Sequence, residues 1–332
     1  MDKRYKCACL GTLARSLRSR RNLGLSRSCF RTFRQGRPLL TQKRLLEFEE
    51  YPSDVQGLAF SINQARVENR QLTRLPTQAD ISLDQSKAYQ VAAAICALRR
   101  KGGEVPLGRK IGFTNRNIWP EYNIDASNWS YMYDRTVTDI PAQTPFSFTV
   151  DVSDMAGLEP KLEPEIIFGL GKAPRAGMTD RQLLDCIAWV SHGFEIVQSV
   201  FPGWKFTAAD TTAAFALHGR LLIGRKIPVE SLGSPDDVLH QLKSFTINLV
   251  LDDEVCDRGA GANVLGSPIN ALRHICEILE QDEGNPPLAD GEVVTTGTLT
   301  RAWAIGDRSR WRTEVRGFGV PGLDCSFTTR TI

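Results

Sequence analysis

Two stretches near the start of the chain carry apolar side chains at the spacing of one helical face. Ser53 can cap the first helix, and the second begins at about Asp84 and ends at the basic, glycine-containing run 99–103. The apolar positions are Val55, Leu58, Ala59, Ile62 and Ala65 in the first stretch and Ala88, Val91, Ala92, Ile95 and Leu98 in the second. We therefore predict an N-terminal helical layer in residues 46–105.

Farther along the chain, the pattern changes between helices and short strands. Thr179 is predicted to begin a third helix and Ser267-Pro268 a fourth. Their apolar positions are Leu183, Leu184, Ile187 and Ala188 in the third and Ile269, Leu272, Ile275 and Leu279 in the fourth. Strands are indicated at 161–168, at 245–251 before a turn at Asp252-Asp253, and at 293–294, 314–318 and 325–328. Helices in front of many short strands predict an α+β domain.

Glu163 and Glu165 are the first candidates for chemistry, because they are one residue apart in a predicted strand. Side chains alternate along a strand, so both carboxylates project from one face with Cα atoms roughly 6.5 Å apart. Like charges this close raise each other's pKa unless a cation lies between them, and Mg²⁺ or Mn²⁺ bound through oxygen meets that need. The alternative is a strand whose polar face lies in water.

A third carboxylate and a lysine occur in unusual surroundings. Glu195 lies in the apolar run 193–197, where an unpaired ionised carboxylate would be costly to bury, so it needs a cation. Lys110 lies in 108–114 with a glycine on either side, which allows a sharp turn or close approach to a ligand. The alternative for Lys110 is a solvated surface residue or a salt bridge to one of the glutamates.

In order along the chain, these segments resemble the fumarylacetoacetate hydrolase superfamily, and within it the branch of 2-oxopent-4-enoate hydratase and 4-oxalocrotonate decarboxylase. The resemblance covers about residues 50–328. The segments that carry it are 108–114 (Gly-Arg-Lys-Ile-Gly-Phe-Thr), 163–165 (Glu-Pro-Glu), 194–197 (Phe-Glu-Ile-Val), 264–271 (Val-Leu-Gly-Ser-Pro-Ile-Asn-Ala) and 294–299 (Val-Thr-Thr-Gly-Thr-Leu).

The resemblance implies a β-rich catalytic core with a rolled sheet, and a homo-oligomer. It implies Glu163, Glu165 and Glu195 as ligands of Mg²⁺ or Mn²⁺, Lys110 as the residue that handles protons, and Thr296 and Gly297 near the substrate. The expected partner is a small 2-oxo acid. A chelated 2-oxo or 2-hydroxy-dienoate could then gain water or lose CO₂ through a metal-bound dienolate. A plain β-turn is the alternative for Thr296-Gly297.

Three positions depart from the family pattern. Pro164 lacks a backbone donor, so its strand must be an edge strand or end its pairing there. Ala214-Phe215 stands where relatives commonly have Asp-Asn, which suggests a more apolar pocket and a larger substrate. Asn128 stands where relatives often have an aspartate, and an amide cannot act as a carboxylate base. Asp125 is therefore the predicted catalytic carboxylate, with Asp134 as the alternative.

Two other functions stay open at this point. An acylpyruvate-type hydrolase would need an activated water, usually held by a glutamate and histidine pair on a short lid, and no histidine precedes Lys110. A non-catalytic member of the same fold is suggested by Asn128 and Ala214-Phe215. Retention of the three glutamates and of Lys110 favours the metal-dependent lyase.

Composition adds a leader to this domain. The chain of 332 residues is 42% hydrophobic and has a net charge of +3, but eleven Lys or Arg residues lie between Lys3 and Arg37, and no acid occurs between Asp2 and Glu47. The remainder is acidic, so no nucleic-acid partner is expected. We predict a leader in residues 1–45, the helical region 46–105, and a metal-dependent catalytic domain in 106–332.

The leader has the features of a mitochondrial transit peptide. Leu10, Leu13, Ala14 and Leu17 recur at helical spacing among arginines and serines, which predicts a protein of the mitochondrial matrix. A disordered basic tail or a mispredicted start codon is the alternative, and the protein would then be cytoplasmic. The longest apolar run, 91–98, is too short for a membrane helix, so no membrane partner is expected.

Cysteine and histidine spacing argues against zinc. The eight cysteines contain no Cys-x-x-Cys, and the four histidines contain no His-Glu-x-x-His. Free thiols in a reducing compartment are expected.

Overall fold

The computed structural model describes residues 44–78, 83–141, 148–282 and 284–330. Residues 42–332 form one compact unit. The predicted transit peptide lies outside the described residues, and the division at residue 105 stays a proposal. Among the described residues, no helix is both long enough and apolar enough to cross a bilayer.

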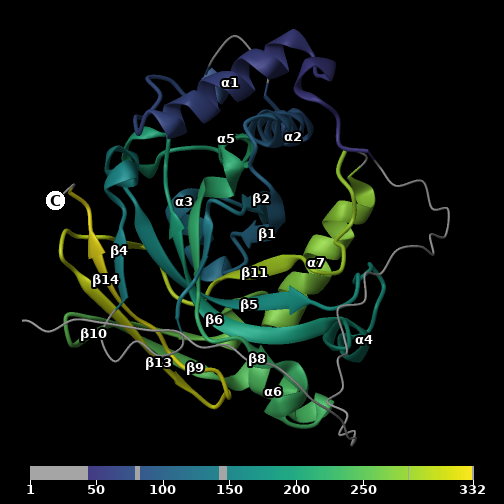
Figure 1. Cartoon of the computed structure of the whole chain (residues 1–332), viewed down its shortest axis with the longest axis vertical. Helices are drawn as coiled ribbons and strands as arrows, with labels where there is room; N and C mark the ends of the chain where they lie inside the picture. The colour runs from purple at the N-terminus through teal and green to yellow at the C-terminus, as the bar shows by residue number, and fades with distance from the viewer. Residues whose placement is uncertain (1–43, 79–82, 142–147, 283, 331–332) are drawn as a thin grey trace, which may run out of the picture. The chain divides into compact units, whose positions relative to one another are not determined.

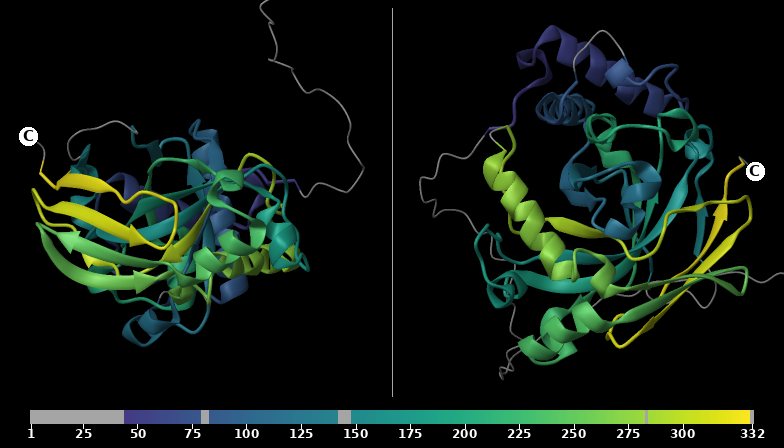
Figure 2. Two further views of the ribbon diagram at one scale, coloured as in Figure 1. Left: turned by 90° about the horizontal axis from the view of Figure 1, so that it is seen from below. Right: turned by 180° about the vertical axis from the view of Figure 1, so that it is seen from behind.

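Two sheets make up most of the unit (Figures 1 and 2). The large sheet has nine strands in the order β2-β1-β11-β5-β6-β7-β3, with β12 paired to β5 and β8 paired to β6. It is curled and open, so the prediction of an α+β fold with a rolled sheet is confirmed. Its strands are β1 (Pro106–Gly112), β2 (Asn128–Tyr133), β3 (Val137–Asp139), β5 (Lys161–Leu170), β6 (Ile187–Val197), β7 (His218–Ile223), β8 (Ile227–Pro228), β11 (Val293–Thr298) and β12 (Trp303–Ala304).

The second sheet packs against the large one through a shared apolar core. Its order is β10-β9-β13-β14-β4, and Trp311 and Phe327 of this sheet contact the core side of β5 and β6 through Leu162 and Phe194. The strands are β4 (Phe148–Asp151), β9 (Thr246–Leu251), β10 (Glu254–Ala260), β13 (Arg310–Arg316) and β14 (Asp324–Thr328). The hairpin that turns at 252–253 is confirmed, and the strand predicted at 314–318 begins earlier, at Arg310.

Seven helices surround the sheets in the described part of the chain. They are α1 (Ser53–Val67), α2 (Gln85–Lys101), α3 (Trp119–Tyr122), α4 (Asp180–Leu184), α5 (Ala208–Ala213), α6 (Pro235–Ser244) and α7 (Pro268–Gln281). At one end of the unit α1 packs on α2, and α2 packs on α5, as Figure 1 shows. Along the other flank, α7 buries Leu272 and Ile275 in the largest core cluster. The predicted helical layer and the helix at Ser267-Pro268 are confirmed.

Two predictions about helix ends need correction. Ser53 is the first residue of α1 and its side chain caps nothing, whereas the Asp84 carboxylate accepts from the backbone amide of Lys87 at 2.8 Å and does cap α2. Thr179 caps α4, but this helix ends at Leu184. Ile187 and Ala188 belong to β6, because the chain reverses at 185–186 and pairs with β5 along eleven residues. Short apolar runs do not distinguish a buried strand from a helix.

Pro164 lies inside the large sheet, so β5 is not an edge strand. Leu299 donates its backbone N–H to Pro164 O at 2.9 Å, and the missing donor of Pro164 faces this same side. On this side the pairing with β11 ends at Glu165 and resumes with β12 at Leu162, as the prediction requires. On the opposite side the pairing with β6 continues through Pro164.

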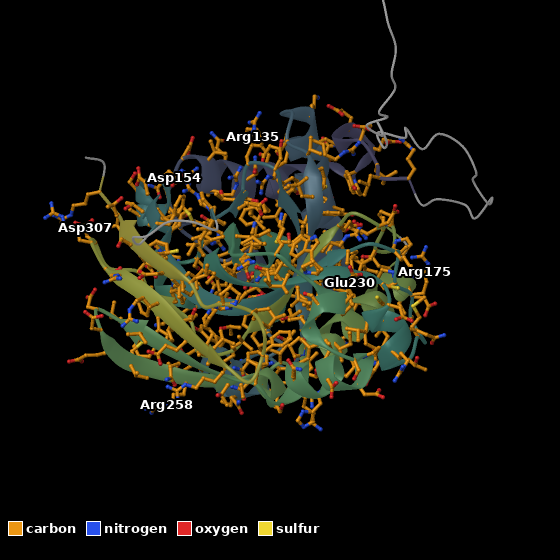
Figure 3. The ribbon with its side chains drawn as sticks, turned by 60° about the horizontal axis from the view of Figure 1, so that its bottom comes forward. Arg135, Asp154, Arg175, Glu230, Arg258 and Asp307 are labelled. Atoms are coloured by element: carbon orange, nitrogen blue, oxygen red, sulfur yellow. The ribbon has the colours of Figure 1, made fainter. Side chains whose placement is uncertain are left out.

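Charged side chains cover the outside of this unit. Figure 3 labels Arg135, Asp154, Arg175, Glu230, Arg258 and Asp307, all of them exposed. A few ionisable side chains, among them Lys110, Glu165 and Glu195, are instead buried.

Candidate metal centre

Three glutamates meet on the inner face of the curled sheet. Glu163 and Glu165 project from one face of β5, and Glu163 lies directly opposite Glu195 of β6 in the antiparallel register. One carboxylate oxygen from each of the three residues lies within 4.8 Å of the others. The structure therefore brings together the three side chains that the sequence predicted as a group.

Glu165 and Glu195, the two fully buried glutamates, each have one carboxylate oxygen held by a hydrogen bond and one without a hydrogen bond. Glu165 Oε2 accepts from the Gly297 amide at 2.8 Å, and Glu195 Oε1 pairs with His218 Nδ1 at 2.8 Å. Glu165 Oε1 and Glu195 Oε2 are buried and have no hydrogen-bond partner. Glu195 Oε2 has the Lys110 ammonium beside it at 3.3 Å, and Glu165 Oε1 has no partner. Buried carboxylate oxygens of this kind fit a hard divalent cation, which binds through carboxylate oxygen.

The pKa values of the three acids are driven apart. Burial raises the pKa of Glu163 to about 7 and that of Glu165 well above its usual range, and the neighbouring Glu195 charge adds to both shifts. Burial also opposes ionisation of Glu195, but the Lys110 ammonium and the His218 hydrogen bond outweigh it and lower the Glu195 pKa to about 2. Without a bound cation, the site holds protons where a metal would supply positive charge.

Lys110 extends from β1 into the same cluster. Its Nζ lies 3.3 Å from Glu195 Oε2, and the side chain is 3% exposed. Burial acts to lower the Lys110 pKa, but the carboxylates of Glu195, Glu163 and Glu165 reverse this effect and raise it. The salt bridge anticipated as the alternative for Lys110 is present, and it places the ammonium beside the three carboxylates.

His218 is a member of the site that the sequence did not reveal. It begins β7, is 1% exposed, and its other ring nitrogen, Nε2, is 3.0 Å from Thr136 Oγ1. The two contacts fix the orientation of the ring and, through it, of the Glu195 carboxylate. The spacing between His218 and the three glutamates forms no motif, so no sequence signal pointed to this histidine.

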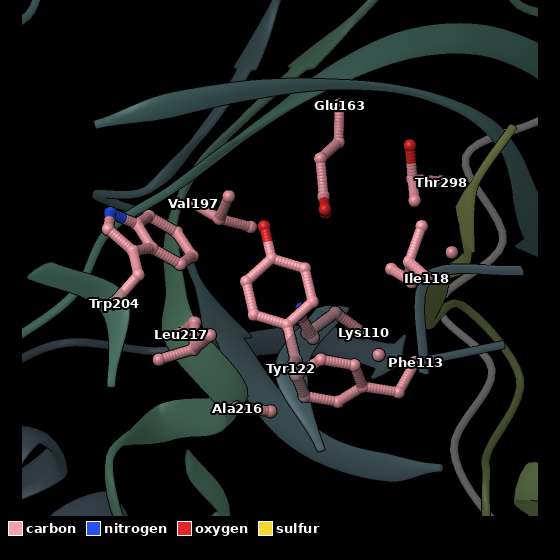
Figure 4. Close-up of a pocket in the computed structure, with 12 residues that line it drawn as sticks. Lys110, Phe113, Ile118, Tyr122, Glu163, Val197, Trp204, Ala216, Leu217 and Thr298 are labelled. Carbon is pink, nitrogen blue, oxygen red and sulfur yellow. The ribbon is translucent and has the colours of Figure 1, made fainter. Parts of the chain in front are cut away.

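A narrow cavity leads to these residues (Figure 4). Its volume is about 20 Å³, room for little more than one water molecule. Tyr122 lies across it with its hydroxyl directed toward Glu163, and Lys161 Nζ donates to that hydroxyl at 3.1 Å. Apart from Lys110, Tyr122, Glu163 and Thr298, the lining has no charged or hydroxyl-bearing side chain. The full lining is Lys110, Gly112, Phe113, Ile118, Tyr122, Glu163, Val197, Trp204, Ala216, Leu217, Gly297 and Thr298.

The remaining predicted site residues are placed differently. Gly297 lines the cavity, whereas the Thr296 hydroxyl donates to Ile166 O at 2.9 Å. Asp125 is exposed, in the turn before β2, and does not line the cavity. Asp134, the alternative to Asp125, is exposed and accepts from the Val105 amide at 3.0 Å.

Besides Pro164, the two other positions that depart from the family pattern are both buried. Ala214 and Phe215 belong to the apolar cluster under α1 and α2, and the next two residues line the cavity in their place. Asn128 lies near Lys110: a Cβ built on Gly112 would be 2.8 Å from Asn128 Oδ1 and 3.2 Å from Lys110 Nζ.

Several known proteins are similar to this chain. Two curated relatives are 2-hydroxyhexa-2,4-dienoate hydratase of Comamonas testosteroni, 25% identical over 70% of this chain and 83% of its own, and 4-oxalocrotonate decarboxylase of Pseudomonas sp, 23% identical over 80% and 95%. Among solved structures, 4-oxalocrotonate decarboxylase from Pseudomonas putida G7, complexed with magnesium and adipate, has a TM-score of 0.72. It is 21% identical, and the match covers 82% of this chain and 97% of that one.

The family model for the fumarylacetoacetate hydrolase C-terminal domain matches residues 136–321. This range includes the three glutamates, His218 and residues 296–298 of β11, and it covers more than half of the chain. The chain therefore belongs to the fumarylacetoacetate hydrolase family.

Proposed function

We propose that this protein is a metal-dependent lyase that hydrates or decarboxylates a 2-oxo or 2-hydroxy-dienoate acid. The observation that carries the proposal is the set of three glutamates whose carboxylate oxygens lie within 4.8 Å of one another beside a buried lysine. The names of the relatives support it, because they are hydratases and a decarboxylase of such acids.

The proposed cofactor is Mg²⁺ or Mn²⁺, held by Glu163, Glu165 and Glu195. Carboxylate oxygen is the ligand atom that both ions prefer. The oxygens of Glu165 and Glu195 that lack a hydrogen bond would bind such an ion. When bound, the ion would polarise the 2-oxo group and neutralise the acids. A decarboxylase of similar fold that was solved with magnesium supports this assignment.

The chain's own residues would do the remaining work. His218 holds the Glu195 carboxylate in place, and the Gly297 amide does the same for Glu165. Lys110, with its ammonium on the cavity wall, would attract the substrate anion and transfer a proton to or from its conjugated chain. Phe113, Tyr122 and Trp204 would exclude bulk water from that step.

Turnover by the purified wild type tests the proposal. The protein is freed of metal, reloaded with Mg²⁺ or Mn²⁺, and given 2-hydroxypenta-2,4-dienoate or 4-oxalocrotonate while the ultraviolet absorbance of the conjugated chain is followed. Loss of absorbance with the first substrate identifies a hydratase, and CO₂ release from the second a decarboxylase. Turnover that persists in excess EDTA would refute the metal role, and an inert metal-loaded protein would refute the proposed reaction.

Two further parts of the proposal concern assembly and location. The family resemblance implies a homo-oligomer, which light scattering of the full chain tests. The basic leader would direct the protein to the mitochondrial matrix, and a fluorescent fusion with and without residues 1–45 tests this.

A further inference from the structure

Asn128, the first residue of β2, has an amide whose orientation is fixed. Its Nδ2 donates to Thr211 Oγ1 at 3.1 Å and to Thr212 Oγ1 at 3.2 Å, both on α5. The Thr211 hydroxyl already donates to Ala208 O, and Thr212 Oγ1 already accepts from Gln85. Turning the amide over would set its oxygen against the Thr211 oxygen, whose proton is in use, so Nδ2 faces α5 and Oδ1 faces away from it.

The other end of this amide has no partner in the protein. Asn128 is 3% exposed, and its Oδ1 is buried without a hydrogen bond. A buried acceptor without a partner is costly, and such atoms are rare in folded proteins. Asn128 pairs with Gly112, which lines the cavity, so an atom of this kind indicates a partner that arrives with a ligand.

The free oxygen faces the same space as Lys110. A Cβ added to Gly112, which lines the cavity, would lie 2.8 Å from Asn128 Oδ1 and 3.2 Å from Lys110 Nζ. The space between acceptor and ammonium therefore exists because residue 112 has no side chain. An oxygen that carries a proton suits it, because such an atom can donate to Oδ1 and accept from Nζ.

We propose that Asn128 is a substrate-binding residue whose Oδ1 accepts a hydrogen bond from the hydroxyl that hydration adds to the conjugated chain. The inference rests on the proposed function. The dienol first becomes the 2-oxo-enoate, as its enol proton leaves oxygen and a proton adds to the terminal carbon. In the hydration step that follows, a C–O bond and a C–H bond form as the remaining carbon–carbon π bond is lost, so water supplies both added groups. Lys110 gives a proton to carbon and recovers one from water, while Asn128 orients the water and the resulting hydroxyl. An amide takes no proton, so Asn128 contributes orientation alone.

A pair of ligands that differ by one hydroxyl tests this at binding equilibrium. The Mg²⁺-loaded full chain is titrated with 4-hydroxy-2-oxopentanoate and with 2-oxopentanoate, and the affinities are compared by calorimetry. The wild type should bind the hydroxylated acid about tenfold more tightly, the value of one well-placed hydrogen bond. Asn128→Leu, which keeps the volume and loses the acceptor, should bind the two acids equally and keep its affinity for 2-oxopentanoate.

Two variants separate the acceptor from a general effect on packing. Asn128→Asp keeps an acceptor oxygen and should keep part of the preference for the hydroxylated acid. Thr211→Val removes a partner that orients the amide, and should reduce the preference while 2-oxopentanoate still binds. In this role Thr211 is a positioning residue, and the ratio of the two affinities is a readout that a loss of stability would not move.

The outcomes distinguish this inference from the proposed function. Equal affinities in the wild type, or a preference that survives in Asn128→Leu, would overturn the role of Asn128 and leave the metal-dependent lyase intact. If neither acid binds to the metal-loaded wild type, the proposed function fails, and the role of Asn128 fails with it.

Discussion

Gly297→Ala should destabilise the fold and weaken the metal centre together. Gly297 has φ +96°, a conformation that costs an L-residue about 1–2 kcal/mol. A Cβ at this position would meet Thr114 Oγ1 at 1.8 Å and Thr114 Cβ at 3.0 Å, so this end of β11 or Thr114 must move. Movement would break the 2.8 Å hydrogen bond from the Gly297 amide to Glu165, and a hydrogen bond of this kind contributes about 0.5–1.5 kcal/mol.

We therefore expect Gly297→Ala to lower the free energy of unfolding by about 3 kcal/mol or more, measured by urea denaturation. Gly177→Ala is the matched control, because Gly177 also has a positive φ, +76°, but nothing lies within 4 Å of its added Cβ. This control should cost about 1 kcal/mol. Calorimetric titration with Mg²⁺ should show weaker binding for Gly297→Ala and unchanged binding for Gly177→Ala.

Thr114→Ala in the Gly297→Ala background tests the steric part of the reasoning. Removal of Oγ1 eliminates the 1.8 Å contact, so the double variant should recover part of the lost stability. If Gly297→Ala costs no more than Gly177→Ala and binds Mg²⁺ as the wild type does, the role assigned to Gly297 is wrong.

Three further predictions concern the charged groups. Glu165→Gln should abolish Mg²⁺ binding and metal-dependent turnover, because it replaces the buried free oxygen with an amide, while circular dichroism remains native; a variant that still binds Mg²⁺ would contradict the ligand assignment. Lys110→Met should reduce turnover by about 100-fold, the usual contribution of a proton-transfer group, and leave Mg²⁺ affinity equal or higher, because a competing positive charge is removed; a variant that is merely unfolded would instead support a structural role for this lysine. Mg²⁺ affinity should rise between pH 6 and pH 8, because the pKa of Glu163 is about 7 and that of Glu165 is also raised, so ions must displace protons. Calorimetry in two buffers of different ionisation enthalpy would detect those protons, and an affinity that does not depend on pH would show that the acids are already ionised.

The sequence pattern correctly predicted the features that depend on a single helix or strand. The period of two places Glu163 and Glu165 on one face of β5, and the helical period identifies the buried faces of α1, α2 and α7. The apolar surroundings of Glu195 correctly indicated a need for a cation, and the Lys110 ammonium lies 3.3 Å from its carboxylate. Local pattern failed at Ile187, where a short apolar run fits a helix and a buried strand equally well.

What the sequence by itself determined about this protein is the set of acids, the lysine and the elements that carry them, since side-chain direction along a strand or helix depends on near neighbours alone. Only the tertiary structure decided which of these side chains meet. The register that sets Glu163 opposite Glu195, the approach of His218 from β7 and the unpartnered oxygen of Asn128 depend on strands distant in sequence. Strand register is fixed by burial and hydrogen bonding across the whole sheet, and no local period encodes it.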